Sequence, residues 1–106
     1  MNDLEHDAHS SEDLTGSSEF TYNQCCRMAL SYAVIGSHGH AYGALRAAAA
    51  KNERWARHHY LYGLVLGTEG NNERACWELG MALQFEPYEE GRIRIRGVMD
   101  ILEGKC

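Results

Sequence analysis

The stretch ARHHYLYGLVLGTEGNNERACWELGMALQFEP, residues 56–87, decides the fold of this 106-residue chain. Its apolar side chains recur at helical spacing on both sides of Gly70-Asn71. A glycine after such a segment supplies a left-handed helix end, and Pro87 cannot continue the second segment. The stretch therefore predicts two helices that are joined by a tight turn.

The same pattern recurs along the chain at a constant spacing in residues, equal to the spacing from Gly36 to Gly70. We call this spacing the repeat offset. Small residues at the recurring points let two helices approach closely, and the recurring glycines supply further helix ends. The sets at the repeat offset are Ala29, Gly63 and Gly97; Gly36, Gly70 and Gly104; Ala41 and Ala75; Leu45 and Leu79; and Ala48 and Ala82. An internal repeat of this length indicates a stack of similar helical units.

The repeat and the apolar spacing predict an all-α fold of about five antiparallel helices. Their expected ranges are 21–35, 40–51, 54–69, 72–85 and 88–103. The run Arg92-Ile93-Arg94-Ile95-Arg96 alternates as a strand would, but Ile95, Val98, Met99 and Leu102 follow helical spacing. We therefore expect the last segment to be helical.

Charge and composition divide the chain into an acidic tail, residues 1–19, and a helical domain, residues 20–106. The first twenty residues contain six acidic residues and no Lys or Arg. They also contain few large apolar side chains, so the tail is expected to be flexible. The remaining ten basic and nine acidic residues nearly balance, which argues against nucleic acid or an anionic membrane as a partner.

Residues 56–87 resemble a tetratricopeptide repeat. The signature positions of that family are occupied by Tyr62-Gly63, Leu66, Gly70, Ala75, Leu79, Ala82 and Pro87. Residues 22–55 resemble a second, degenerate repeat, in which Glu53 replaces the usual terminal proline. The resemblance implies a short solenoid of two repeats, closed by residues 90–104 as a capping helix or as the first helix of a third unit.

In this family the first helix of each pair lines a concave groove that holds a peptide or a helix. Carried over to this chain, the groove would be mostly apolar with two arginines, which suits an amphipathic helix of a partner protein. Some of these side chains, Ala33 and Val34 above all, could instead pack helix on helix. The expected lining is Cys26, Leu30, Ala33, Val34, Arg57, Tyr60, Leu64, Thr68, Arg94, Val98 and Leu102.

The size of the chain and the run Ala33-Val34-Ile35-Gly36-Ser37, followed by His40, are similar to the needle chaperones of bacterial type III secretion. That resemblance implies a cytoplasmic chaperone that holds the amphipathic helix of a needle subunit and acts with a small helical co-chaperone. Two alternatives remain open: a translocator-type chaperone, and a structural module that self-associates, for example as a homodimer, through its end helices. No segment has the length and apolar character of a membrane helix or a secretory signal.

No catalytic, metal or cofactor site is expected. The two histidine pairs, His38 with His40 and His58 with His59, fall at opposite ends of the helical layer. Cys25 and Cys26 lack an evident base and orienting partner, and buried free thiols are the expected state of the four cysteines. The chain also lacks the glycine-rich motifs that bind phosphate, so we expect a binding protein and not an enzyme.

The only basic cluster is formed by Arg92, Arg94 and Arg96. On a helix Arg94 points away from the other two, and Arg96 can pair with Asp100 four residues further on. No aromatic residue is interleaved with these charges, as single-stranded nucleic acid would require. We interpret the cluster as a solvated helix face with ion pairs.

Overall fold

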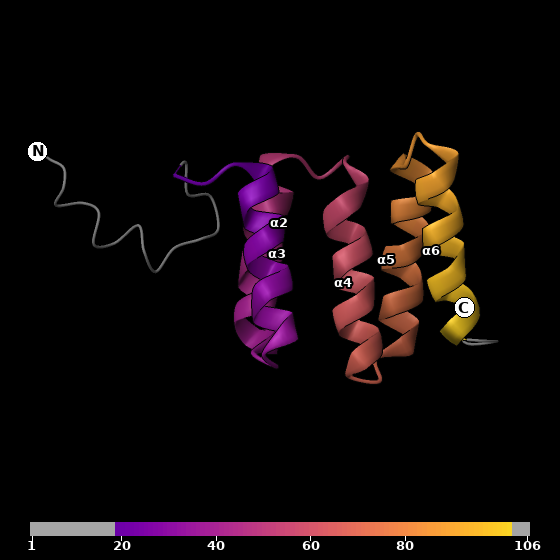
Figure 1. The fold of residues 1–106 in the computed structure, drawn as a ribbon, viewed down its shortest axis with the longest axis horizontal. Coiled ribbons are helices and arrows are strands. Elements are labelled where there is room, and N and C mark those ends of the chain that lie inside the picture. Colours follow the sequence, from indigo (N-terminus) through magenta and orange to yellow (C-terminus); the bar gives the residue numbers. More distant parts are fainter. Residues whose placement is uncertain (1–18, 103–106) are drawn as a thin grey trace, which may run out of the picture. The chain divides into compact units, whose positions relative to one another are not determined.

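The computed structural model describes residues 19–102, and this part of the chain is entirely helical apart from its turns. The prediction of an all-α fold with five helices is confirmed, and no helix boundary differs from the expected one by more than two residues. The predictions for residues 1–18, Gly104 and Cys106 lie outside the described residues. The helices are α2 (Tyr22–Val34), α3 (His38–Lys51), α4 (Ala56–Thr68), α5 (Asn72–Phe85) and α6 (Glu89–Leu102) (Figure 1).

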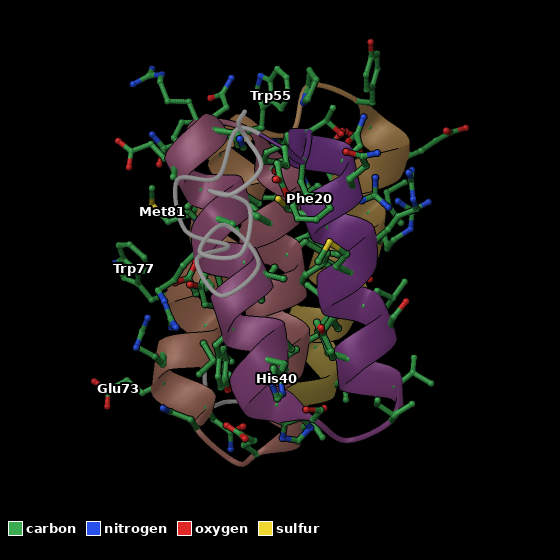
Figure 2. The ribbon with its side chains drawn as sticks, turned by 90° about the vertical axis from the view of Figure 1, so that its left-hand side faces the viewer. Phe20, His40, Trp55, Glu73, Trp77 and Met81 are labelled. Carbon is green, nitrogen blue, oxygen red and sulfur yellow. The ribbon has the colours of Figure 1, made fainter. Side chains whose placement is uncertain are left out.

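The described helices belong to two compact units that divide between Asn52 and Glu53. In the first unit, α2 and α3 pack as an antiparallel hairpin, with Phe20 and His40 at opposite ends (Figure 2). Thr21 begins α2 with a capping box: the Thr21 amide donates to Gln24 Oε1 at 2.8 Å, and the Gln24 amide donates to Thr21 Oγ1 at 3.1 Å. These bonds satisfy amides that a helix N-terminus leaves unpaired.

In the second unit, α4 and α5 form a hairpin whose backbone repeats that of α2 and α3. Both first helices have 13 residues and both second helices have 14, and every boundary is displaced by the repeat offset. Gly36 and Gly70 follow the first helices with φ of 82° and 84°. This left-handed conformation favours glycine, which explains why glycine recurs at this position.

Each hairpin turn is closed by the same two backbone hydrogen bonds. The glycine amides, Gly36 and Gly70, donate to the carbonyl oxygens of Ala33 and Gly67, both at 3.0 Å. The following amides donate five residues back, Ser37 to Tyr32 at 2.8 Å and Asn71 to Leu66 at 2.9 Å. This is the Schellman motif, so the sequence repeat corresponds to a repeated three-dimensional unit.

Close approach of α4 and α5 depends on Gly63. A Cβ atom built at this position would lie 2.6 Å from both Leu79 Cγ and Leu79 Cδ2, and 3.4 Å from the backbone oxygen of Ala75. The side chain of Leu79 therefore fills the space that any other residue at position 63 would need. Leu79 is fully buried and joins Ala56, Ala82 and Ile95 in the core of the second unit.

The last helix, α6, packs against α5 and α4 through Ile95 and the partly buried Val98, Met99 and Leu102. Arg92 Nη1 donates to the backbone oxygen of Leu83 at 2.7 Å. This bond gives a partner to a carbonyl group in the last turn of α5. The alternating segment 92–96 is thus helical, because Ile95 meets the core together with Val98, Met99 and Leu102 at helical spacing. No helix among the described residues has the length and apolar character that crossing a membrane requires.

The different surroundings of two equivalent glycines, Gly63 and Gly97, give a first prediction. Gly63→Ala should lower the free energy of unfolding by about 1–3 kcal/mol, because its methyl group collides with Leu79. Gly97→Ala should raise it by about 0.5–1 kcal/mol, because no described atom lies within 4 Å of the new Cβ and alanine is the better helix former. Urea denaturation followed by circular dichroism measures both values.

Gly80→Ala is the matched control, since Gly80 is also helical, exposed and without neighbours at its Cβ position. It should behave as Gly97→Ala does. Equal effects at positions 63 and 97 would contradict the close helix approach that is assigned to Gly63.

Candidate functional site

The predicted groove residues of the first unit differ in their exposure. Cys26 is completely buried, so its assignment to an open groove is wrong. Leu30 and Val34 are exposed, with 45% and 77% of their surfaces accessible, and Ala33 is half-buried. Leu30 and Val34 lie four residues apart and so share one side of α2.

The predicted groove residues of the second unit lie on α4 and α6. Tyr60, Val98 and Leu102 are partly buried and pack against the same core cluster, which brings these parts of α4 and α6 together. Leu102 also reaches α4 directly, since its Cδ2 atom lies 3.5 Å from the Cβ position of Gly67. Leu64 is half-buried, four residues from Tyr60.

Two exposed arginines and Thr68 complete this set. Arg57 and Arg94 expose their side chains, while the hydroxyl of Thr68 donates to the backbone oxygen of Leu64 at 2.8 Å. We call the apolar residues Tyr60, Leu64, Val98 and Leu102 the α4–α6 face. Arg57 precedes Tyr60 on α4, and Arg94 precedes Val98 on α6. Arg96 pairs with Glu89 at 3.6 Å, where the sequence suggested Asp100, and Arg92 lies 4.0 Å from Glu89.

A shallow depression on α2 was not predicted from the sequence. It has a volume of about 520 Å³ and is lined by both apolar and polar side chains. It lies on a different side of α2 from Leu30 and Val34. The sequence signal that could have predicted this depression is a second stripe of residues on α2, spaced three and four residues apart. The lining residues are Phe20, Gln24, Arg27, Met28, Ser31 and Tyr32.

The core of the second unit contains a buried polar cluster of His58, His59 and Glu78. His59 Nδ1 lies 2.8 Å from Glu78 Oε1, and His59 Nε2 lies 3.0 Å from the backbone oxygen of Glu53. The carbonyl oxygen can only accept, so Nε2 donates to it, and the raised pKa of His59 favours the ring form in which Nδ1 also carries a proton and donates to Glu78. The cluster is therefore a buried ion pair, with Arg74 Nη2 at 3.6 Å from the other Glu78 oxygen.

The two histidines have opposite shifts of pKa. Burial lowers the pKa of His58, and the neighbouring charge of His59 lowers it further, to about 4. Burial also disfavours the charged form of His59, but the bonds to Glu78 and to the backbone oxygen of Glu53 outweigh it, so the pKa of His59 is raised. The rings lie side by side, with centroids 4.1 Å apart.

This ion pair stands where the first unit has an apolar core. At the repeat offset, His59 corresponds to Cys25 and Glu78 corresponds to Ala44, both fully or almost fully buried. The same backbone thus accepts either a small apolar pair or a hydrogen-bonded charged pair. The sequence alone did not reveal the pairing, because residues 59 and 78 meet only when α4 and α5 pack.

The histidines and cysteines of residues 19–102 are residue types that can bind a metal ion. No group of three or more His, Cys, Asp or Glu side chains in this range has metal-binding geometry. His40 instead bonds through Nδ1 to Ser37 Oγ at 2.8 Å and stacks on Tyr32. Cys25 and Cys26 are buried free thiols as expected, whereas Cys76 is disulfide-bonded and departs from that expectation.

Comparison with known proteins adds no relative to this picture. No protein-family model matches the chain, and neither a curated protein nor a solved structure matches it. The geometry of the chain itself is therefore the basis for assigning a function.

The histidine cluster predicts a stability maximum near pH 6.5. His59 keeps a proton that the unfolded chain releases above its ordinary pKa of about 6.5, so its contribution is complete below that pH and is lost as the pH rises through the raised folded pKa. His58 excludes a proton that the unfolded chain binds, so stability also falls as the pH drops from about 6.5 towards 4. Urea denaturation between pH 4.5 and about 9 measures both limbs.

The first unit supplies the control variant for this prediction. Replacing His59→Cys together with Glu78→Ala installs the residues found at the equivalent positions, and it should abolish the alkaline decline. Glu78→Ala alone should cost about 3–5 kcal/mol, more than the double variant, because it leaves buried His59 without its carboxylate. An unchanged alkaline limb in the double variant would rule out the ion pair as its source.

Proposed function

We propose that this chain is a helical-repeat protein of the tetratricopeptide kind that holds an amphipathic helix of a partner protein. The α4–α6 face carries the proposal. On it, Tyr60 of α4 packs against the same core cluster as Val98 and Leu102 of α6, Leu64 follows Tyr60 by four residues, and all four side chains keep part of their surface exposed. Two pairs of apolar groups, each at a helical spacing of four residues, suit the apolar side of a second helix.

The repeated hairpin supports the same proposal. A unit of two helices and a glycine turn recurs at the repeat offset with matching helix lengths and matching turn hydrogen bonds. In repeat proteins the first helices of successive units contribute equivalent positions to one binding surface. Here Leu64 of α4 and Val98 of α6 occupy one such position within the second unit, and both are half-buried apolar residues.

The charges beside this face favour an acidic edge on the partner helix. Arg57 precedes Tyr60 by one helical turn, and Arg94 precedes Val98 by one turn; both arginines are exposed. Exposed charges contribute more to the rate and selectivity of association than to its affinity. The resemblance to needle chaperones gives the proposal its specific form, in which the ligand is the amphipathic helix of a needle subunit and the complex forms in the cytoplasm.

Peptide binding tests this function. The probe is a fluorescent peptide with the C-terminal helix of a type III needle subunit, and its anisotropy is followed as the full chain is added. Leu64→Glu should weaken binding at least tenfold, about 1.4 kcal/mol, because it places a charge in an apolar contact. Leu64 is the position of choice since it lies outside the core cluster of Ala56, Leu79, Ala82 and Ile95.

Trp77→Glu is the matched control for Leu64→Glu. Trp77 is a large, exposed apolar residue on α5 whose side chain projects outward (Figure 2), and the substitution makes the same change of charge. It should leave the affinity unchanged, and a peptide of the same composition in scrambled order should fail to bind. Equal affinities for the two glutamate variants, with circular dichroism showing both folded, would reject the assigned face.

A further inference from the structure

The outer side of α6 carries an exposed stripe formed by Ile93, Gly97 and Ile101. These residues are four apart, so they lie on one side of the helix. Ile93 and Ile101 expose 58% and 76% of their surfaces, and no described atom lies within 4 Å of the Cβ position of Gly97. This outer stripe lies away from Ile95, Val98 and Leu102, which face the core.

The outer stripe occupies positions that are covered in the two hairpins. One repeat offset earlier in the chain, Ile93 corresponds to His59 and Gly97 corresponds to Gly63. In α4 both positions are buried by α5, with Leu79 seated over Gly63. The corresponding residues of α2, Cys25 and Ala29, are likewise buried in the hairpin with α3. The outer stripe therefore has the position of a surface that receives the second helix of a hairpin.

The composition of the outer stripe also differs from that of a solvated end helix. A helix that closes a repeat array normally turns a polar face outward, which keeps the array soluble. The outer stripe instead exposes two isoleucines beside a glycine, and exposed apolar groups of this kind favour association. We propose that the outer stripe is a docking surface for a helix of a partner protein, which completes a third hairpin with α6.

The two existing hairpins specify the chemistry of that partner helix. In α3 and α5 the buried face has alanine, leucine and alanine at intervals of four and three residues: Ala41, Leu45 and Ala48, and Ala75, Leu79 and Ala82. A leucine over Gly97, with small residues one turn away on each side, reproduces this contact. Because Ile93 is apolar, the position of Glu78 should be taken by a small apolar residue, as Ala44 does in α3.

Charge gives the partner helix a further property. Glu90 and Asp100 are exposed at the positions that correspond to Ala56 and Leu66, both of which are buried in the second unit. A docked helix would bring its edges close to these two carboxylates. The partner helix should therefore carry lysine or arginine beside its alanine and leucine face. The helix α3 has this combination, with Arg46 and Lys51 beside such a face. This surface is separate from the α4–α6 face, so either proposal can fail without the other.

A synthetic peptide with the sequence of residues 37–52 is the probe, since it carries α3 and has the required face and charges. Its fluorescence anisotropy is measured against the full chain and against Gly97→Leu, which fills the seat of the partner leucine without touching a described neighbour. Binding to the unaltered chain should weaken at least tenfold in Gly97→Leu. The same loss should follow from Ile101→Asp and from the peptide change Leu45→Asp.

Gly80→Leu provides the control, because Gly80 is an exposed helical glycine outside the outer stripe and should leave binding unchanged. Failure of the peptide to bind the unaltered chain would overturn the proposal. Equal binding to the Gly97→Leu variant would also overturn it, since the peptide would then have replaced α3 on α2. A dimer of the chain alone that Gly97→Leu abolishes would assign the outer stripe to a second copy and overturn the partner assignment.

Discussion

The close contact between the two helices of a hairpin is the constraint on which the described structure depends. At Gly63 the backbone of α4 comes so near to α5 that Leu79 occupies the space of a missing side chain. The equivalent positions of the first hairpin, Ala29 and Leu45, are both buried. This contact sets which side of each first helix faces its partner, and hence which side remains for the next helix or for a ligand.

Given that backbone, the core tolerates two kinds of chemistry. The first hairpin places Cys25 and Ala44 at positions where the second places His59 and Glu78. The charged pair is acceptable because both nitrogens of His59 find acceptors within 3.0 Å. His58 beside it remains neutral at ordinary pH, with a pKa of about 4. The second unit thus contains a histidine and a carboxyl group at positions where the first has a buried thiol and a methyl group.

The same constraint gives α6 two distinct sides. Its inner side meets the core through Ile95, while its outer side repeats the positions that receive a second helix in both hairpins. Repeat units cannot bury all of their apolar surface alone, and each new helix leaves a further surface to be covered. Both proposed binding surfaces therefore lie on α4 and on α6, which corresponds to the first helix of a hairpin. The α4–α6 face is proposed for the ligand, and the outer stripe of α6 is proposed for the partner.

The sequence by itself determined the helices and their order. A regular recurrence of small residues, with Gly36 and Gly70 at helix ends, is local information that backbone sterics convert directly into turns. Tertiary structure alone decided which side chains stay accessible. Cys26 and Leu30 have the same helical stripe, yet one is completely buried and the other is exposed, because burial depends on the neighbouring helix. The pairing of His59 with Glu78 has the same origin, since contacts between residues distant in sequence arise only when helices pack.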